Sequence, residues 1–172
     1  MRFDDATMDA VARVHGALAS RDEQLAIAES CTGGLVAGAM TAAAGASEVF
    51  ELGVVTYSNV AKRRLLDVPQ LTLSRTGAVS GPTARAMAVG VRNLGDATWG
   101  LSITGIAGPD GGRPGKPVGT VFIGVATSRD GRSKSRARRV RFDGDRASVR
   151  RQTVRSALER VGELVEASPR DR

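Results

Sequence analysis

The feature that most constrains the fold of this chain is an abrupt change of pattern around residue 30. Residues 25–28 form a short apolar run, residues 29–34 read ESCTGG, and a helix-like stretch begins at residue 35. This order is typical of a strand that turns into a helix. The hydroxyl of Ser30 is then expected at a strand end beside a helix N-terminus, where free N–H groups and the dipole favour an anion or oxyanion. We therefore predict a nucleophile and an anion site within one short segment.

The rest of the chain alternates between helices and strands at first and becomes richer in strands later. The pattern predicts helices over 7–20, 34–43, 58–66, 82–94 and 145–167, and strands over 25–29, 48–57, 99–104, 118–127 and 132–142, with a turn at 129–131. The expected helix caps are Ser58 or Asn59, Ser80, and Asp145. This order predicts a three-layer α/β/α sandwich with a mixed, mostly parallel sheet, in which the nearly all-apolar strand 118–127 is central.

The length and the cysteine content limit the class of protein. The 172 residues suffice for one full core, so we expect a single domain over 1–172. We find neither an apolar signal segment nor an apolar run long enough to cross a bilayer. One cysteine, Cys31, and one histidine, His15, provide neither a disulfide nor a zinc cluster. His15 falls on the apolar stripe of the first helix, which favours a packing role. We expect a cytoplasmic protein without membrane contact, metal or cofactor.

The net charge of +7 is concentrated near the C-terminus. Residues 1–128 hold 11 basic and 11 acidic side chains, whereas residues 129–172 hold 14 basic and 7 acidic ones. The segment 132–142 places Arg132, Lys134, Arg136 and Arg138 on one face, as in an edge strand protected by charge. The alternative is a nucleic-acid surface over 129–155. Because aromatic residues for stacking are only 3% of the chain, nucleic acid is the less favoured partner.

A serine hydroxyl needs a base, and Lys62 is the candidate. It lies in the first turn of the helix predicted over 58–66, where the dipole disfavours a cation, and partial burial would lower its pKa further. Tyr57, just before that helix, can relay the proton or orient the pair. The alternative is that Lys62, beside Arg63 and Arg64, is a surface charge and that Tyr57 is a core aromatic.

Two further segments carry possible chemistry. The glycine-rich loop 104–112 follows a strand, so its backbone can approach a ligand and Thr104 can donate a hydrogen bond, although such a loop is more often a set of turns. Arg146, at the start of the last helix, is a candidate phosphate clamp. Cys31 is an alternative nucleophile because helix N-termini activate thiolates, but no well-placed histidine supports it.

Six motifs in one order carry a resemblance to a known family: ESCTGG at 29–34, GVVTYSN at 53–59 with Lys62, GAVS at 77–80, TGIAGP at 104–109, KPVGT at 116–120 and GDR at 144–146. From about residue 7 to 166, the chain resembles the CinA C-terminal domain family of competence/damage-inducible proteins, whose active members are nicotinamide-mononucleotide deamidases. Position 60 is valine, where the family often carries an acidic residue. The N-terminal domain of many relatives, which resembles molybdopterin-binding proteins, is missing here, so we expect a stand-alone form.

The resemblance implies hydrolysis of nicotinamide mononucleotide to nicotinate mononucleotide and ammonia, in pyridine-nucleotide salvage, by an enzyme that needs no cofactor. Ser30 would be the nucleophile, and Tyr57 and Lys62 its activating partners. The implied substrate-binding residues are Thr32, Gly33, Gly34, Asn59, Thr104, Gly105, Ile106, Ala107, Gly108 and Arg146. The family also implies a homo-oligomer, a dimer or larger. The alternatives are a regulatory domain that binds the nucleotide without turnover and the nucleic-acid-binding protein described above.

Overall fold

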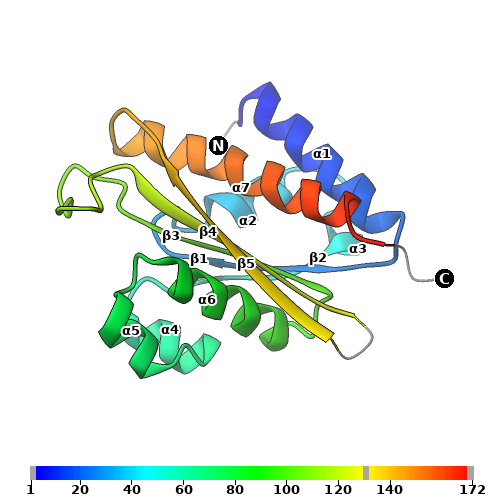
Figure 1. Ribbon diagram of the computed structural model, residues 1–172. Helices are drawn as coiled ribbons and strands as arrows, with labels where there is room; N and C mark the ends of the chain where they lie inside the picture. The colour runs from blue at the N-terminus through cyan, green and yellow to red at the C-terminus, as the bar shows by residue number, and fades with distance from the viewer. Residues whose placement is uncertain (1–2, 130–131, 170–172) are drawn as a thin grey trace.

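A five-stranded sheet forms the middle layer of the computed structural model, which describes residues 3–129 and 132–169 (Figure 1). The strands lie in the order β2-β1-β3-β4-β5. Their bounds are β1 Leu25–Glu29, β2 Phe50–Val55, β3 Trp99–Gly105, β4 Thr120–Arg129 and β5 Arg132–Arg141. Of the turn predicted at 129–131, residues 130 and 131 lie outside the described part of the chain.

The sheet is mixed, as the sequence predicts. β1 pairs in parallel with both β2 and β3, whereas β4 pairs antiparallel with β3 and with β5. Four of the strands therefore run in one direction and β4 runs against them. β3 is the middle strand, and the apolar β4 lies beside it in the interior of the sheet. β5 lies at an edge, which agrees with the charged edge strand expected over 132–142.

Helices cover both faces of the sheet (Figure 1). Their bounds are α1 Asp5–Ala19, α2 Leu35–Met40, α3 Ala46–Val49, α4 Asn59–Leu66, α5 Gln70–Thr76, α6 Gly81–Leu94 and α7 Arg146–Glu166. Alternate residues of β1 face opposite cores: Leu25 and Ile27 pack with α1, α2 and α7, whereas Ala26 and Ala28 pack with α4, α5 and α6. The three-layer α/β/α sandwich is confirmed.

The predicted caps position the helices that flank the sheet. The Ser58 hydroxyl accepts from Ala61 N (3.0 Å) at the start of α4, and Ser80 and Asp145 cap α6 and α7 in the same way. Ser58 rather than Asn59 is therefore the cap of α4. The helix predicted to end near residue 43 ends at Met40, and a turn through Gly45, whose φ is +80°, leads into the short α3. The sequence analysis missed α3 and α5.

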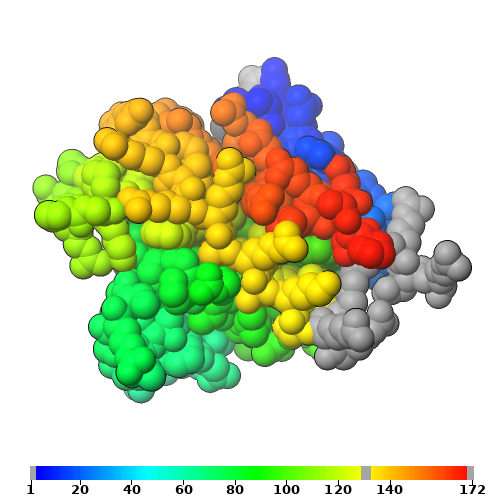
Figure 2. Space-filling view, viewed as in Figure 1, coloured from blue at the N-terminus to red at the C-terminus, as the bar shows by residue number. Residues whose placement is uncertain are grey.

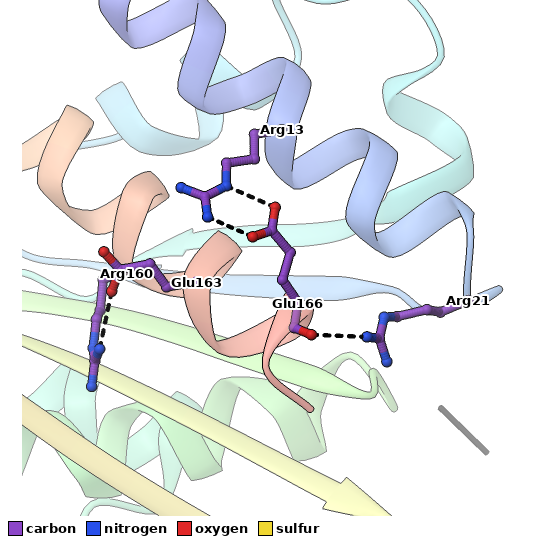
Figure 3. Close-up of polar contacts among 5 residues, drawn as sticks. All are labelled: Arg13, Arg21, Arg160, Glu163 and Glu166. Atoms are coloured by element: carbon purple, nitrogen blue, oxygen red, sulfur yellow. Dashed lines mark hydrogen bonds and ion pairs between the residues drawn. The ribbon is translucent and has the colours of Figure 1, made fainter. Parts of the chain in front are cut away.

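The long C-terminal helix α7 lies along α1, and polar contacts join the two (Figure 3). Arg13 Nε donates to Glu166 Oε1 at 2.7 Å, and Arg21 donates to the Glu166 carbonyl at 3.3 Å. Exposed pairs of this kind contribute little to stability, so the apolar face of α7 provides most of the packing energy. Its buried side chains include Val149, Val154, Leu158 and Val165.

The outer surface of β5 is strongly basic. Lys134, Arg136 and Arg138 are exposed and take part in no ion pair among the described residues. In the space-filling view the segment of β5 lies beside α7 on the face toward the reader (Figure 2). Among the residues that the structure describes, no helix has both the length and the apolar character that crossing a bilayer requires.

Candidate active site

The site lies where the three mutually parallel strands end. Ser30 follows β1, Thr56 and Tyr57 follow β2, and Gly105 ends β3. From β1 the chain moves first to β2 on one side and then, after α4 to α6, to β3 on the other side. Such a reversal at the carboxyl ends of parallel strands is the usual position of ligand sites in open α/β sheets. Ser30 stands at this position.

The central contact of the site joins Ser30 to Lys62. Lys62 Nζ lies 3.1 Å from Ser30 Oγ, and it also donates to the carbonyl oxygens of Thr56 (2.7 Å) and Tyr57 (3.2 Å). Ser58 caps α4, and the first turn of this helix carries Lys62 to Ser30. The interpretation of Lys62 as a surface charge is therefore wrong.

Burial gives Lys62 the character of a base. Its side chain is only 1% exposed, and loss of hydration lowers its pKa from 10.5 to about 8. Near neutral pH a usable fraction of the amine is then uncharged. The two carbonyl oxygens can only accept hydrogen bonds, so they take the two N–H groups of a neutral amine and leave its lone pair for the Ser30 hydroxyl.

The anion site predicted at the N-terminus of α2 is filled by the protein itself. The carboxylate of Glu29, 1% exposed, accepts from the N–H groups of Gly34 (3.0 Å), Val36 (3.2 Å) and Ala37 (2.8 Å). The expectation that these amides receive a substrate anion or an oxyanion is corrected accordingly. Glu29 instead fixes the turn that follows Ser30, in which Gly33 (φ +63°) and Gly34 (φ +94°) are left-handed.

Replacing Glu29 by glutamine is expected to destabilise the protein by about 2–4 kcal/mol. The amide keeps one acceptor oxygen but turns an NH₂ group toward backbone donors in a buried position. Urea unfolding of Glu29→Gln measures the effect. Glu51→Gln, at an exposed position on β2, is the matched control and should change stability by less than about 0.5 kcal/mol. Equal stability of the two variants would contradict the structural role of Glu29.

A surface pocket of about 280 Å³ opens in front of the serine and the lysine. Its lining comprises Ser30, Cys31, Tyr57, Lys62, Ala78, Val79, Thr104, Gly105, Ile106, Ala107, Gly108, Asp110, Gly111 and Arg146. One wall is the loop that connects β3 to β4. Cationic side chains hold this loop through backbone carbonyls: Lys116 donates to Thr76 O (3.0 Å), and Arg139 donates to Gly115 O. Thr104, predicted as a ligand donor, donates its hydroxyl hydrogen to Ala78 O (2.9 Å).

The first turns of α7 supply two arginines to the same region. Arg146 Nη1 donates to Gly108 O at 2.8 Å, and its Nη2 lies 3.5 Å from the Tyr57 hydroxyl. Arg150, one turn later, donates from Nη2 to Thr32 O at 2.7 Å. Arg146 lines the pocket and is exposed, so its guanidinium can meet an anion at the rim.

The structure brings most of the predicted site residues together. Ser30, Tyr57, Lys62, Arg146 and the loop residues 104–108 share the pocket. Thr32, Gly33, Gly34 and Asn59 are not among the residues that line it. Tyr57 is 64% exposed, so it is not a core aromatic. It contacts Lys62 through its carbonyl, and its hydroxyl points toward Arg146.

Sequence reasoning missed several residues of the site. Ala78 and Val79 belong to the GAVS motif but were given no role, and Asp110 and Gly111, within the predicted loop 104–112, were not named as binding residues. Glu29 and Arg150 were not recognised as partners of the Ser30 loop. The ESCTGG motif contained a signal for Glu29, since an acidic residue shortly before a helix N-terminus can cap it.

The structure favours Cys31 as a buried thiol rather than a nucleophile, and it gives His15 a packing role. Burial raises the pKa of the Cys31 thiol to about 11, so the thiolate that a nucleophile requires is rare at neutral pH. His15 Nε2 lies 3.2 Å from Met40 O, a contact that joins α1 to α2. Within residues 3–129 and 132–169, no group of three or more His, Cys, Asp and Glu side chains is arranged to hold a metal ion.

Fold and site together define an α/β/α sandwich protein with a serine–lysine pair at the switch point of its sheet. The model of the CinA C-terminal domain matches residues 7–165. The chain therefore belongs to the CinA C-terminal domain family.

Curated relatives and solved structures agree with this assignment. A CinA-like protein from Anaeromyxobacter sp. (strain K) is 55% identical over 141 residues, which cover 82% of this chain and 34% of that protein. A CinA-like protein from Geobacter metallireducens is 52% identical over 135 residues, 78% of this chain and 32% of that protein. The chain thus spans about a third of the length of these relatives.

Among solved structures, the competence/damage inducible protein CihA from Agrobacterium tumefaciens superposes with a TM-score of 0.88 at 38% identity, covering 96% of this chain and 99% of that one. The competence damage-inducible protein A from Klebsiella pneumoniae gives a TM-score of 0.87 at 36% identity, covering 95% and 99%.

Proposed function

We propose that the protein is an amidohydrolase that converts nicotinamide mononucleotide to nicotinate mononucleotide and ammonia. The observation that carries this proposal is the 3.1 Å contact between Ser30 Oγ and a buried Lys62 whose pKa is lowered to about 8. A hydroxyl beside a partly neutral amine is the arrangement that activates a serine without histidine. The family resemblance adds the substrate.

The neutral amine of Lys62 acts first as a base. It takes the proton of Ser30 while the Ser30 oxygen bonds to the carboxamide carbon of the substrate. The tetrahedral intermediate then collapses as the C–N bond breaks. The leaving nitrogen takes the proton from Lys62 and departs as ammonia, and Ser30 remains acylated by the nicotinate group.

Water resolves the acyl-enzyme in the second half of the reaction. Lys62, neutral again, takes a proton from the attacking water, whose oxygen bonds to the acyl carbon, and the bond to Ser30 Oγ breaks with return of the proton to Ser30. The amides of Gly34, Val36 and Ala37 bind Glu29, so the oxyanion must be stabilised by other donors around the pocket.

The proposed reaction is tested by ammonia release from nicotinamide mononucleotide, nicotinamide riboside, nicotinamide and NAD. We expect release from nicotinamide mononucleotide, with the other compounds slower. Calorimetric binding of the mononucleotide without any ammonia release would contradict the enzyme and favour the regulatory alternative. If the protein neither binds nicotinamide mononucleotide nor releases ammonia from it, the pyridine nucleotide is excluded as the ligand.

Arg146 is expected to recognise the phosphate of the substrate. Arg146→Gln should lower kcat/KM for nicotinamide mononucleotide by about 10- to 100-fold, since a charge-assisted hydrogen bond contributes about 1.5–3 kcal/mol. Its effect on nicotinamide riboside, which has no phosphate, should be several-fold smaller. Steady-state kinetics on both substrates measure the difference, and an equal loss on both would show that Arg146 acts only through the Gly108 loop.

A further inference from the structure

The geometry points to Arg150 as a positioning residue, which holds the Ser30 loop in its reactive position by binding the Thr32 carbonyl from outside the pocket; its effect on turnover rests on the proposed function. Arg150 Nη2 donates to Thr32 O at 2.7 Å. Thr32 stands two residues after Ser30. Arg150 itself is not among the residues that line the pocket, so its influence must pass through the loop.

Glu29 fixes the end of the loop at the start of α2, whereas Arg150 holds the part of the loop nearer to Ser30. Glu29 binds the amides of residues 34, 36 and 37 at the start of α2. The carbonyl of Thr32, between Ser30 and these amides, is bound by Arg150. Access is close: a Cβ atom at Gly33, whose φ is +63°, would lie 3.3 Å from Arg150 Nη2. The guanidinium therefore packs closely against the backbone of the loop, and a side chain at 33 would push it away by a few tenths of an ångström.

The same helix face also holds the opposite wall of the pocket. Arg146 and Arg150 are four residues apart, so their side chains lie on one side of α7. Arg146 binds Gly108 O in the loop after β3, and Arg150 binds Thr32 O in the loop after β1. The first two turns of α7 thus join the two loops across which a substrate would lie. This arrangement relates the position of Ser30 to that of the loop 106–119.

The chemistry of Arg150 favours this role over one in stability alone. Its Nε is buried and has no hydrogen-bond partner among the described residues, and no ion pair with a described carboxylate involves it. Arg150 is partly buried, and a partly desolvated guanidinium without a counter-ion carries a cost that an apolar side chain in such a place often avoids. What an apolar replacement loses is the bond to the Thr32 carbonyl.

The test compares Arg150→Met, Arg150→Lys and Arg151→Met, the last at the exposed neighbouring position on α7. Two readouts are measured well below the melting temperature of each variant. The first is the amide hydrogen exchange of peptides that cover residues 30–34. The second is the rate at which a fluorophosphonate probe labels Ser30, with Ser30→Ala as the blank.

For Arg150→Met we expect faster exchange in the loop and labelling slower by about 10- to 100-fold, because a displacement of about 1 Å can reduce reactivity by about 100-fold. Arg150→Lys, which can still donate one hydrogen bond to Thr32 O, should recover most of both, and Arg151→Met should match the wild type. On nicotinamide mononucleotide, kcat should fall with KM within about twofold.

Unchanged exchange and labelling in Arg150→Met, or equal losses in the methionine and lysine variants, would overturn the inference. The failure of the proposed function has a different signature. A wild-type protein that is labelled at Ser30 but releases no ammonia contradicts the deamidase alone, and the labelling and exchange rates still decide the role of Arg150. A wild type that is not labelled at all contradicts the reactive serine and, with it, the effect of Arg150 on reactivity.

Discussion

Ser30→Ala is expected to lower the rate of ammonia release by about 10⁴-fold or more, with the fold and the melting temperature nearly unchanged. Ser30 is 9% exposed and its hydroxyl faces the amine of Lys62 at 3.1 Å. Loss of the nucleophile removes the covalent pathway, and only the residual effect of binding and polar donors remains. The smaller alanine fits the site, so folding should not be affected. Single-turnover kinetics with nicotinamide mononucleotide measure the loss.

Ser74→Ala is the matched control for this substitution. Ser74 is exposed on α5, and its hydroxyl donates only to Leu71 O within its own helix. The control should retain the wild-type rate. A second measurement tests the covalent step: hydroxylamine should trap the nicotinoyl group as a hydroxamate with the wild type and not with Ser30→Ala. Equal turnover by wild type and Ser30→Ala would rule out Ser30 as the nucleophile.

The parts of the fold that local patterns determine were predicted well. β1 is a short apolar run before a glycine-rich turn, and polar caps precede α4, α6 and α7. The predicted bounds of these four elements agree with the structure to within about two residues. The short helices α3 and α5 were missed because four and seven residues are too few to show a period. The direction and neighbours of the strands depend on tertiary packing, so the sequence gives the class of the sheet but not its order.

The site shows the same division between local and long-range information. The serine and the lysine were identified from motifs, but the burial of Lys62 follows from the loops of three strands that meet above it. The first turn of α4 brings the lysine there, and its partner, Ser30, lies 32 positions earlier in the sequence. The predicted anion site was wrong because local reasoning counted free amides at the start of α2 and overlooked the side chain of Glu29 that binds them.

Tyr57 lines the pocket, where its backbone and its side chain make different contributions. The sequence interpretation assigned it to proton relay or orientation. In the structure its carbonyl oxygen accepts from Lys62, a contact that any residue at position 57 would retain, and its ring is exposed at the pocket rim. Only the hydroxyl near Arg146 depends on the tyrosine side chain. The proposed relay therefore stays a prediction, whereas the contribution of the backbone to orienting the lysine does not depend on it.

Lys62→Met is expected to lower ammonia release by about 10²- to 10⁴-fold, the usual contribution of a general base. The pH profile of the wild type should contain an ascending limb near pH 8, because the base must lose its proton and its pKa is about 8. The variant should have a residual rate without this limb. A wild-type rate that falls between pH 6 and 8 would contradict a neutral lysine as the base.

The lowered pKa of Lys62 also predicts how the free energy of unfolding of Lys62→Met changes with pH relative to the wild type. The folded pKa of Lys62 is about 8 and its ordinary value is 10.5, so between these values the unfolded chain binds a proton that the folded protein has released. The stability that this pKa difference gives the folded wild type is therefore fully present above pH 10.5, and it is lost as the pH falls through 8. Lys62→Met lacks this contribution. Its free energy of unfolding, relative to the wild type, should fall by about 2 kcal/mol between pH 7.0 and 9.5.

Urea unfolding at the two pH values measures this difference, and Lys134→Met, an exposed lysine on β5, is the control whose difference from the wild type should not change with pH. A buried amine that is costly to charge is a poor choice for stability at neutral pH, and the apolar methionine avoids that cost. The presence of the lysine is therefore better explained by reactivity than by folding. A pH-independent difference for Lys62→Met would mean that the amine keeps its ordinary pKa, and the base proposed for Ser30 would be lost with it.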